Sequence, residues 1–240
     1  NILYAGTDDG LIHVTIDGGF SWNSMSVDKL PDAPKTSFVN DIKADLHNDK
    51  VAYVALDNHK FGDYRPMLYK TSNGGKSWSS ITNGLPDETL IWRIVQDHVD
   101  PNLLFLATEY GLYFSNNQGD KWTKFSNGLP TISIRDLAIQ KRENDLVLDT
   151  FGRGFYVLDN YSPLRELNYV LEQEAAFFST KPGLLFQRAN IGGMGYKGGQ
   201  HYRSKNPPMG VTFQLHIAEG ATRVKAARPE ANKELPHYPT

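Results

Sequence analysis

Three arginines stand at or near expected strand ends, and their guanidinium groups could bind a ligand carboxylate. Arg93 and Arg135 lie on strands that follow two copies of an Asn-Gly-Leu-Pro turn, and Arg153 stands between two glycines. Arginine forms bidentate hydrogen bonds with carboxylates, so three arginines on one face could clamp an acidic ligand. Cleavage of a glycosidic bond beside such a clamp would also need a nucleophilic Tyr with a Glu partner. No such pair stands out, so the arginines favour binding over catalysis.

A second candidate chemistry is glycoside hydrolysis by two carboxylates, which must face each other about 5–10 Å apart. Asp41, Asp97 and Asp136 are the candidates, and all three are expected in equivalent strands of a repeated unit. Their recurrence indicates a role in the repeat, because catalytic residues should be singular. We therefore favour a protein that is not an enzyme and keep glycoside hydrolysis as the alternative.

Three further residues could bind a ligand at the ends of apolar strands. Asp8 and Glu109 each follow such a strand at matching positions, and Arg153 takes the corresponding position in the last unit. The alternative for the two acids is a polar turn that closes a hairpin. For Arg153 the alternative is an ion pair with a carboxylate of a neighbouring unit, although its departure from the repeat makes it a candidate ligand-binding residue.

No metal site and no cofactor site is expected. The seven histidines are scattered, and none forms a pair with metal-ligand spacing on a plausible common face. The glycines around Gly193 and Gly195 lack the strand-to-helix unit of a dinucleotide-binding fingerprint. The chain contains no cysteine, so disulfide bonds play no part.

One eight-residue pattern, called the box below, occurs three times and contains three of the four tryptophans. Each box has a hydroxyl residue, Asp or Asn two residues later, Gly two after that, and Trp three further on. Glycine supplies positive φ, and the polar side chains can hydrogen-bond nearby backbone, so we expect structural duties for the boxes. The box residues are Thr15, Asp17, Gly19 and Trp22; Thr71, Asn73, Gly75 and Trp78; and Ser115, Asn117, Gly119 and Trp122.

The spacing of the boxes predicts a β-propeller. The tryptophans of successive boxes are 56 and 44 residues apart, and short apolar strands flank each box. About four strands in each period of roughly 40–50 residues is the composition of a propeller blade. The fold class is therefore all-β, with a partial β-propeller of four-stranded blades followed by part of a β-sandwich-like module.

The boxes resemble the Asp-box (BNR) repeat of sialidases, xyloglucan-cleaving propellers and the sortilin-type receptor propeller. The chain is most similar to large, sortilin-like Asp-box proteins of bacteria, whose final blade commonly reads like Asp149–Arg165 here. In those proteins a segment like Asn206–Gly210 follows in a strand-rich module, and the resemblance covers most of residues 1–217. It implies a secreted, cell-surface or periplasmic protein. It says little about function, because this repeat occurs in enzymes, receptors and scaffolds alike.

Three domains are expected. Residues 1–167 form about three and a half blades, the C-terminal part of a larger propeller, because closure needs about 4–8 blades. Residues 168–220 form a connector and the β-sandwich-like segment, with a Gly-rich loop at 190–210 and a strand at 211–217. The tail 221–240 is left unassigned.

The expected function is a binding or scaffold module of a larger protein, with a protein or carbohydrate ligand at the propeller face. Its partners would be the rest of the same polypeptide or a cell-surface complex. A formal net charge of −2 gives no basic field for nucleic acid or an anionic membrane. All apolar runs are shorter than the ~18 residues of a membrane span. The alternatives are a xyloglucanase- or sialidase-like hydrolase, with catalytic carboxylates partly outside this chain, and a sortilin-like peptide receptor.

Overall fold

The computed structural model of the chain describes residues 1–183, 185 and 209–219. Most of the expected Gly-rich loop and the tail 221–240 therefore lie outside the described residues. The chain divides into one unit at Asn1–Arg165 and a second at Glu166–Thr240. Each unit is described by itself.

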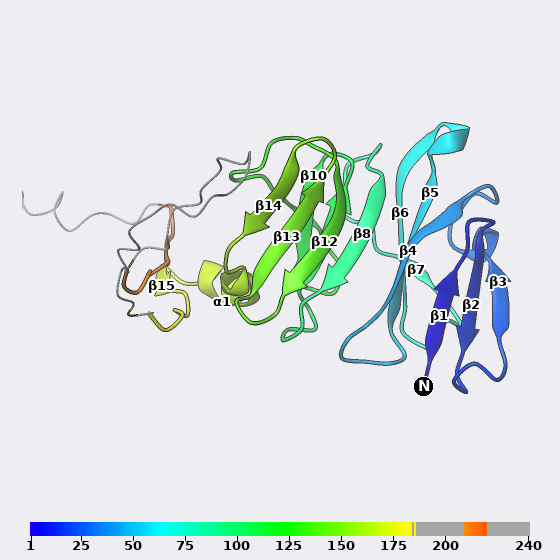
Figure 1. Ribbon diagram of the computed structural model, residues 1–240, viewed down its shortest axis with the longest axis horizontal. Coiled ribbons are helices and arrows are strands. Elements are labelled where there is room, and N and C mark those ends of the chain that lie inside the picture. Colours follow the sequence, from blue (N-terminus) through cyan, green and yellow to red (C-terminus); the bar gives the residue numbers. More distant parts are fainter. Residues whose placement is uncertain (184, 186–208, 220–240) are drawn as a thin grey trace, which may run out of the picture. The chain divides into compact units, whose positions relative to one another are not determined.

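The first unit consists of four antiparallel sheets that follow one another along the chain (Figure 1). We call them blades 1 to 4, and the prediction of an all-β propeller is confirmed. Blade 1 contains β1 (Leu3–Gly6), β2 (Leu11–Thr15) and β3 (Asn23–Ser26); blade 2 contains β4 (Phe38–Ala44), β5 (Ala52–Asn58), β6 (Asp63–Thr71) and β7 (Ser79–Ser80); blade 3 contains β8 (Ile91–Gln96), β9 (Leu104–Thr108), β10 (Gly111–Ser115) and β11 (Thr123–Phe125); blade 4 contains β12 (Ile134–Gln140), β13 (Asp145–Thr150) and β14 (Gly154–Leu158).

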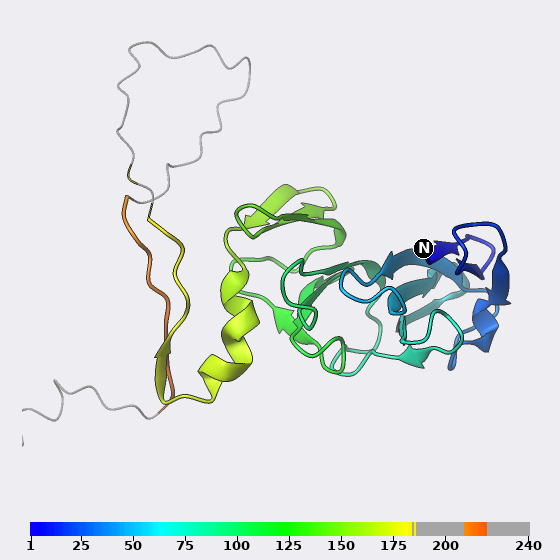
Figure 2. The same cartoon turned by 90° about the horizontal axis from the view of Figure 1, so that it is seen from below.

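The core lies between successive blades. Every residue of β5 and β9 is buried, which explains the continuous apolar runs in these two strands. One buried cluster joins blades 1 and 2, and a second, which includes Trp122, joins blades 2 and 3. Figure 2 shows the blades from below. The strand β8 contacts both β4 and β12. We call these three the inner strands.

The inner strands share an irregularity near their N-terminal ends. In each, the pairing with the next strand skips one residue, and the skipped residues are Asn40, Trp92 and Arg135. A β-bulge of this kind bends the strand and re-aims a side chain, and bulges are common next to binding sites. The repeat therefore has a second recurring feature besides the box.

Blades 1 and 4 each have three strands. Blade 1 begins with β1, whose pairing partner is β2 and whose residues are mostly exposed. Blade 4 ends with β14, after which the chain enters a 3-10 helix, η3 (Ser162–Glu166). The first unit also contains the 3-10 helices η1 (Val27–Lys29) and η2 (His59–Phe61).

The described part of the second unit contains a short helix and a two-stranded sheet. The helix α1 (Leu167–Leu171) begins at the expected connector, and β15 (Ala175–Phe177) pairs with β16 (Leu215–Ile217). The strand expected at 211–217 is therefore limited to its last three residues. The β-sandwich-like module remains an expectation for this unit.

Candidate functional site

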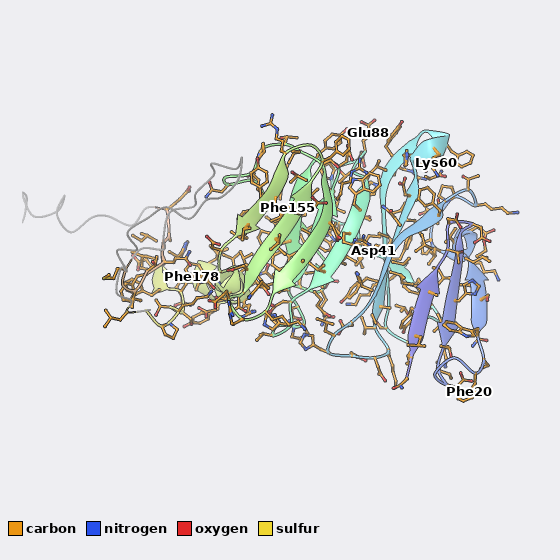
Figure 3. All side chains as sticks on the ribbon, viewed as in Figure 1. Phe20, Asp41, Lys60, Glu88, Phe155 and Phe178 are labelled. Carbon is orange, nitrogen blue, oxygen red and sulfur yellow. The ribbon has the colours of Figure 1, made fainter. Side chains whose placement is uncertain are left out.

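The two ends of the blades differ in character. The three boxes connect β2 to β3, β6 to β7 and β10 to β11, and we call their end the box face. At the opposite end, called the turn face, the chain turns from β1 to β2, from β5 to β6, from β9 to β10 and from β13 to β14. Figure 3 shows Lys60 and Glu88 at the turn face and Phe20 of the first box at the opposite end. Asp8, Glu109 and Arg153 all lie in turn-face connections.

Two of the bulged residues meet on the turn face between blades 3 and 4. The guanidinium carbon of Arg135 lies 3.8 Å from the ring centroid of Trp92 and 5.5 Å from that of Phe151. Among aromatic rings the indole face attracts a cation most strongly, so this contact is favourable. The bulges place this pair, since a regular ladder would direct both side chains differently.

Glu109 completes this cluster from the β9–β10 turn. Its Oε2 accepts hydrogen bonds from Trp92 Nε1 (2.9 Å) and Ser133 Oγ (2.9 Å). Arg135 Nη2 lies 3.5 Å from the same oxygen, which makes a salt bridge. Three donors therefore converge on Oε2. The Nε of Arg135 is buried and has no hydrogen-bond partner among the described residues. We call Trp92, Glu109, Ser133, Arg135 and Phe151 the bulge cluster.

Aromatic and charged groups extend the bulge cluster across blade 2. His59 makes an edge contact with Trp92, with 6.3 Å between ring centroids, and a second edge contact with Phe38. The buried carboxylate of Asp57 lies 2.7 Å from His59 Nδ1, and Lys60 Nζ lies 4.8 Å from the Phe38 ring centroid. The turn face therefore carries a continuous row of rings and charges over three blades.

Farther along the inner strands, Arg93 joins three blades through two carboxylates. Its Nη1 lies 3.1 Å from Asp41 Oδ1 in β4, and its Nε lies 2.9 Å from Asp136 Oδ1 in β12. Asp41 is buried, and its Oδ2 also accepts a hydrogen bond from the Ile94 backbone N–H. Burial would lower the pKa of Arg93, but the two carboxylates outweigh it and raise that pKa above its usual range. Two of the three candidate arginines are thus already paired with carboxylates of this chain.

Asp97 is not equivalent to Asp41 and Asp136, which corrects the expected recurrence. It lies after β8, at the start of the β8–β9 connection, and its side chain is fully buried. Arg165 binds it with Nε–Oδ2 and Nη2–Oδ1 distances of 2.7 and 2.8 Å, and Tyr161 OH donates to Oδ1 at 2.6 Å. Burial alone would raise the pKa of Asp97, but the hydrogen bonds from Arg165 and Tyr161 outweigh it and lower that pKa to about 2. We call Asp97, Tyr161 and Arg165 the clasp.

Asp8 and Arg153 lie on the turn face but outside the bulge cluster. Both are exposed, and the described part of the chain contains no ion pair to either side chain. Arg153 is flanked by Gly152 and Gly154, whose φ angles are 83° and 71°, so the turn depends on these glycines. Of the three candidates, the structure brings Glu109 alone into contact with residues of a neighbouring blade.

The three boxes share one hydrogen-bond pattern. In the first box Thr15 Oγ1 donates to Asp17 Oδ1 (2.7 Å) and accepts from Gly19 N (2.9 Å), while Asp17 Oδ1 accepts from Ser21 N (2.9 Å). Hydrogen bonds from Ser21 hold the pKa of Asp17 well below its usual range. The second and third boxes repeat the pattern at Thr71, Asn73, Gly75 and Ser77, and at Ser115, Asn117, Gly119 and Lys121.

Two of the box tryptophans, Trp78 and Trp122, pack against the preceding blade. Trp122 is 2% exposed, and its Nε1 donates to Ile81 O of blade 2 at 2.7 Å. Trp78 is 9% exposed and belongs to the cluster between blades 1 and 2. Trp22, in blade 1, is 44% exposed.

In the described ranges, no group of three or more His, Asp or Glu side chains is placed to hold a metal ion. The helices within the same ranges are all too short or too polar to cross a membrane.

Sequence reasoning missed the hydrogen bonds from Trp92 and Ser133 to Glu109 and the contact of Phe151 with Arg135. One signal was present, because Trp92 is the one tryptophan outside the boxes. The sequence did single out Arg135, but as part of a clamp for an external carboxylate. Its contact with Glu109 depends on a shift in strand pairing that residue types do not reveal.

Neither a protein-family model nor a curated protein matches the chain, but solved structures do. An ancestral GH74 enzyme is 20% identical with a TM-score of 0.50, over 62% of this chain and 20% of that one. YCF48 bound to D1 peptide is 16% identical with a TM-score of 0.49, and the match covers 67% of this chain and 48% of that one. The extracellular domain of the putative one-component system BT4673 from B. thetaiotaomicron is 18% identical with a TM-score of 0.49. That match covers 67% of this chain and 20% of the other.

The chain thus spans between a fifth and a half of the length of these structures. At such identities the likeness shows the fold alone.

Proposed function

We propose that this chain is part of a β-propeller that works as a binding or scaffold module of a larger protein and holds a protein ligand at the turn face. The observation that carries the proposal is the bulge cluster. Bulges in two neighbouring blades direct Trp92 and Arg135 against each other. Glu109 in the β9–β10 turn holds both side chains, through a hydrogen bond from Trp92 and a salt bridge with Arg135. Tryptophan and arginine are the residue types most enriched among those that dominate protein–protein binding energies.

The cluster is suited to binding because its polar groups are fixed in advance. A stacked guanidinium and an anchored carboxylate lose little conformational freedom when a partner arrives, and such preorganisation raises affinity. We assign Glu109, Trp92 and Arg135 to the centre of the binding face. Asp8 and Arg153 are proposed as peripheral contacts in turns of the same face.

The second candidate is a glycoside hydrolase, favoured by the fold shared with the ancestral GH74 enzyme. The contacts of Arg93 count against it. Asp41 and Asp136 are the carboxylates of neighbouring inner strands, and both are paired with this one guanidinium. Two catalytic carboxylates must face a substrate from opposite sides, whereas these two are bridged by one guanidinium of the same chain. The resemblance of the boxes supports a secreted or cell-surface location, and it also leaves a sortilin-like peptide receptor as a variant of the binding proposal.

A turnover assay separates binding from hydrolysis. The chain would be incubated with xyloglucan and with sialoside substrates, beside the variants Asp41→Asn and Asp136→Asn. We expect no turnover above that of a buffer blank. Turnover by the unaltered chain that either substitution abolishes would overturn the binding proposal in favour of a hydrolase.

A selection experiment tests the location of the binding face. Peptides displayed on phage would be selected on the immobilised chain, and the selected peptides would be tested against Arg135→Ala and Arg142→Ala. Arg142 is the matched control, because its side chain is 81% exposed and pairs with the adjacent Glu143. We expect Arg135→Ala to weaken binding at least tenfold and Arg142→Ala to leave it unchanged.

A further inference from the structure

A hollow on the turn face lies between blades 2 and 3, beside the bulge cluster. It has a volume of about 320 Å³ and is lined by Tyr64, Glu88, Leu90, Glu109 and Tyr110. A second hollow of about 390 Å³ shares Glu88 and Tyr110 with it. We call the first hollow the tyrosine–glutamate pocket. Its volume is at the low end of the range of roughly 300–1,000 Å³ for ligand sites, which suits one side chain better than a chain of sugar rings.

The lining of this pocket is aromatic and negatively charged. The rings of Tyr64 and Tyr110 are about half exposed. Glu88 and Glu109 supply two carboxylates, and the five lining residues include neither Lys nor Arg. Tyrosine faces attract cations through the negative potential of the ring, and carboxylates accept hydrogen bonds from them. This combination is complementary to an ammonium or guanidinium group.

Glu109 has an oxygen left for a ligand. The hydrogen bonds from Trp92 and Ser133 and the salt bridge to Arg135 all go to Oε2. Its Oε1 has no partner among the described residues. The carboxylate is thus anchored through one oxygen, while the other can accept a hydrogen bond.

Glu88 is held in an unusual backbone conformation. Its φ angle of 58° lies in the left-handed region, which non-glycine residues seldom adopt. Two positions further on, Leu90 O accepts a hydrogen bond from the backbone N–H of Glu109, so the connection that carries Glu88 is fastened to the turn that carries Glu109 and Tyr110. Figure 3 shows Glu88 at the turn face. The fold therefore fixes both carboxylates on the same pocket.

We infer that the tyrosine–glutamate pocket takes a cationic side chain, Lys or Arg, of a protein partner, with Tyr64 and Tyr110 around the cation and Glu88 and Glu109 as acceptors. This inference deepens the proposed function and rests on it for the identity of the partner as a protein. Charge decides against an anionic group. Arg135, the cation beside Glu109, is already bound to Trp92 and Glu109, so it does not offer its charge to an anion in the pocket, and Lys124 lines only the second hollow.

The test uses three small probes: the N-acetyl, N′-methylamide derivatives of lysine, norleucine and glutamate. Binding to the full chain would be followed by ligand-observed NMR titration. The lysine probe should bind, the norleucine probe should bind at least tenfold more weakly because it lacks the ammonium group, and the glutamate probe should not bind. Absence of lysine binding, or equal binding of lysine and norleucine, would overturn the inference.

Variants locate the probe. Glu88→Gln and Tyr110→Leu should each weaken lysine binding about tenfold or more. Asp120→Asn is the matched control, because Asp120 is an exposed carboxylate of the third box, at the opposite end of blade 3. Thermal melts would show that all three variants fold. Equal lysine affinity of folded Glu88→Gln and the control would contradict the assignment.

The two proposals can fail separately. If displayed peptides bind in an Arg135-dependent way but the lysine probe does not bind, the inference about the pocket is wrong and the proposed function stands. If the lysine probe binds as described while the chain selects no peptide, the pocket stands and the proposed function is wrong.

Discussion

At the scale of single residues, the same amino acid in the same motif has different surroundings in each blade. Trp122 is buried against blade 2 and donates a hydrogen bond to Ile81 O, whereas Trp22 in the first box is 44% exposed. The box thus fixes the turn locally, and the contribution of its tryptophan depends on what the indole packs against. This difference supplies a matched pair of variants.

We expect Trp122→Ala to lower the free energy of unfolding by roughly 3–5 kcal/mol, the usual cost of removing a buried aromatic side chain. Trp22→Ala should lower it by less than about 1 kcal/mol, because the indole is partly in water already. Urea denaturation of the two variants and the unaltered chain measures both values. Equal losses would show that the tryptophan acts within its own box and not between blades.

Arg153 is exposed on the turn face, where the described residues offer it no ion pair. Arg153→Ala should therefore leave the melting temperature unchanged and reduce ligand binding modestly, as expected of a peripheral contact. A lower melting temperature would instead support the alternative in which this arginine pairs with a neighbouring blade. Thermal melts and binding of a selected peptide would be measured on the same preparation.

At the scale of the elements, the bulges in the inner strands are the feature that the sequence does not predict. Their bulges re-aim Trp92 and Arg135, and a bulge depends on how two strands pair, which residue types leave open. The contacts within the clasp could not be predicted either, because its residues are far apart in the sequence. Asp97 meets Tyr161 and Arg165, which lie more than 60 residues later, and nothing near Asp97 marks those partners. Spacing suggested instead that it repeats Asp41 and Asp136, which was wrong.

The clasp should make stability depend on acidity. The folded-state pKa of Asp97 is about 2, below its ordinary value of 3.8, so the unfolded chain takes up the proton first as pH falls. Its contribution is present in full above about pH 5, decreases as pH falls through 3.8, and is lost at about pH 2. A depression of this size corresponds to roughly 2 kcal/mol.

Asp97→Asn should therefore destabilise the chain by about 2–4 kcal/mol at pH 7, because Arg165 also loses its buried partner. The difference from the unaltered chain should shrink as pH approaches 2. Urea midpoints at a series of pH values would measure this convergence. A constant difference from pH 7 to pH 2 would mean that the carboxylate charge of Asp97 is not what stabilises the clasp.

At the scale of the whole molecule, the sequence predicted the blade repeat because the box is a local motif with its own hydrogen bonds. Apolar runs marked the central strands, since residues there are buried against blades on both sides. Contacts between blades were not predictable, and Arg93 is the clearest case. Its residue type and position predict a possible ligand clamp, yet it pairs with carboxylates of both neighbouring blades.

Arg93→Ala should destabilise the first unit by about 2–3 kcal/mol, because it leaves the buried carboxylate of Asp41 without its closest cation. This loss of stability is smaller than that expected for breaking a fully buried ion pair, because the Arg93 side chain is one-third exposed. Arg142→Ala, at an exposed ion pair, should change stability by no more than about 0.5 kcal/mol. Urea denaturation measures both, and equal effects would mean that the inner-strand ion pairs do not hold the blades together.

We propose that the turn face binds a protein ligand through the bulge cluster, so peptide affinity should depend on Trp92 and Arg135. The most direct test is the dissociation constant of one selected peptide for the unaltered chain, Arg135→Ala and Trp92→Ala, measured by isothermal titration calorimetry on variants shown to be folded. Both variants should bind the peptide at least tenfold more weakly. Unchanged affinity for both, in proteins that still melt cooperatively, would contradict this proposal.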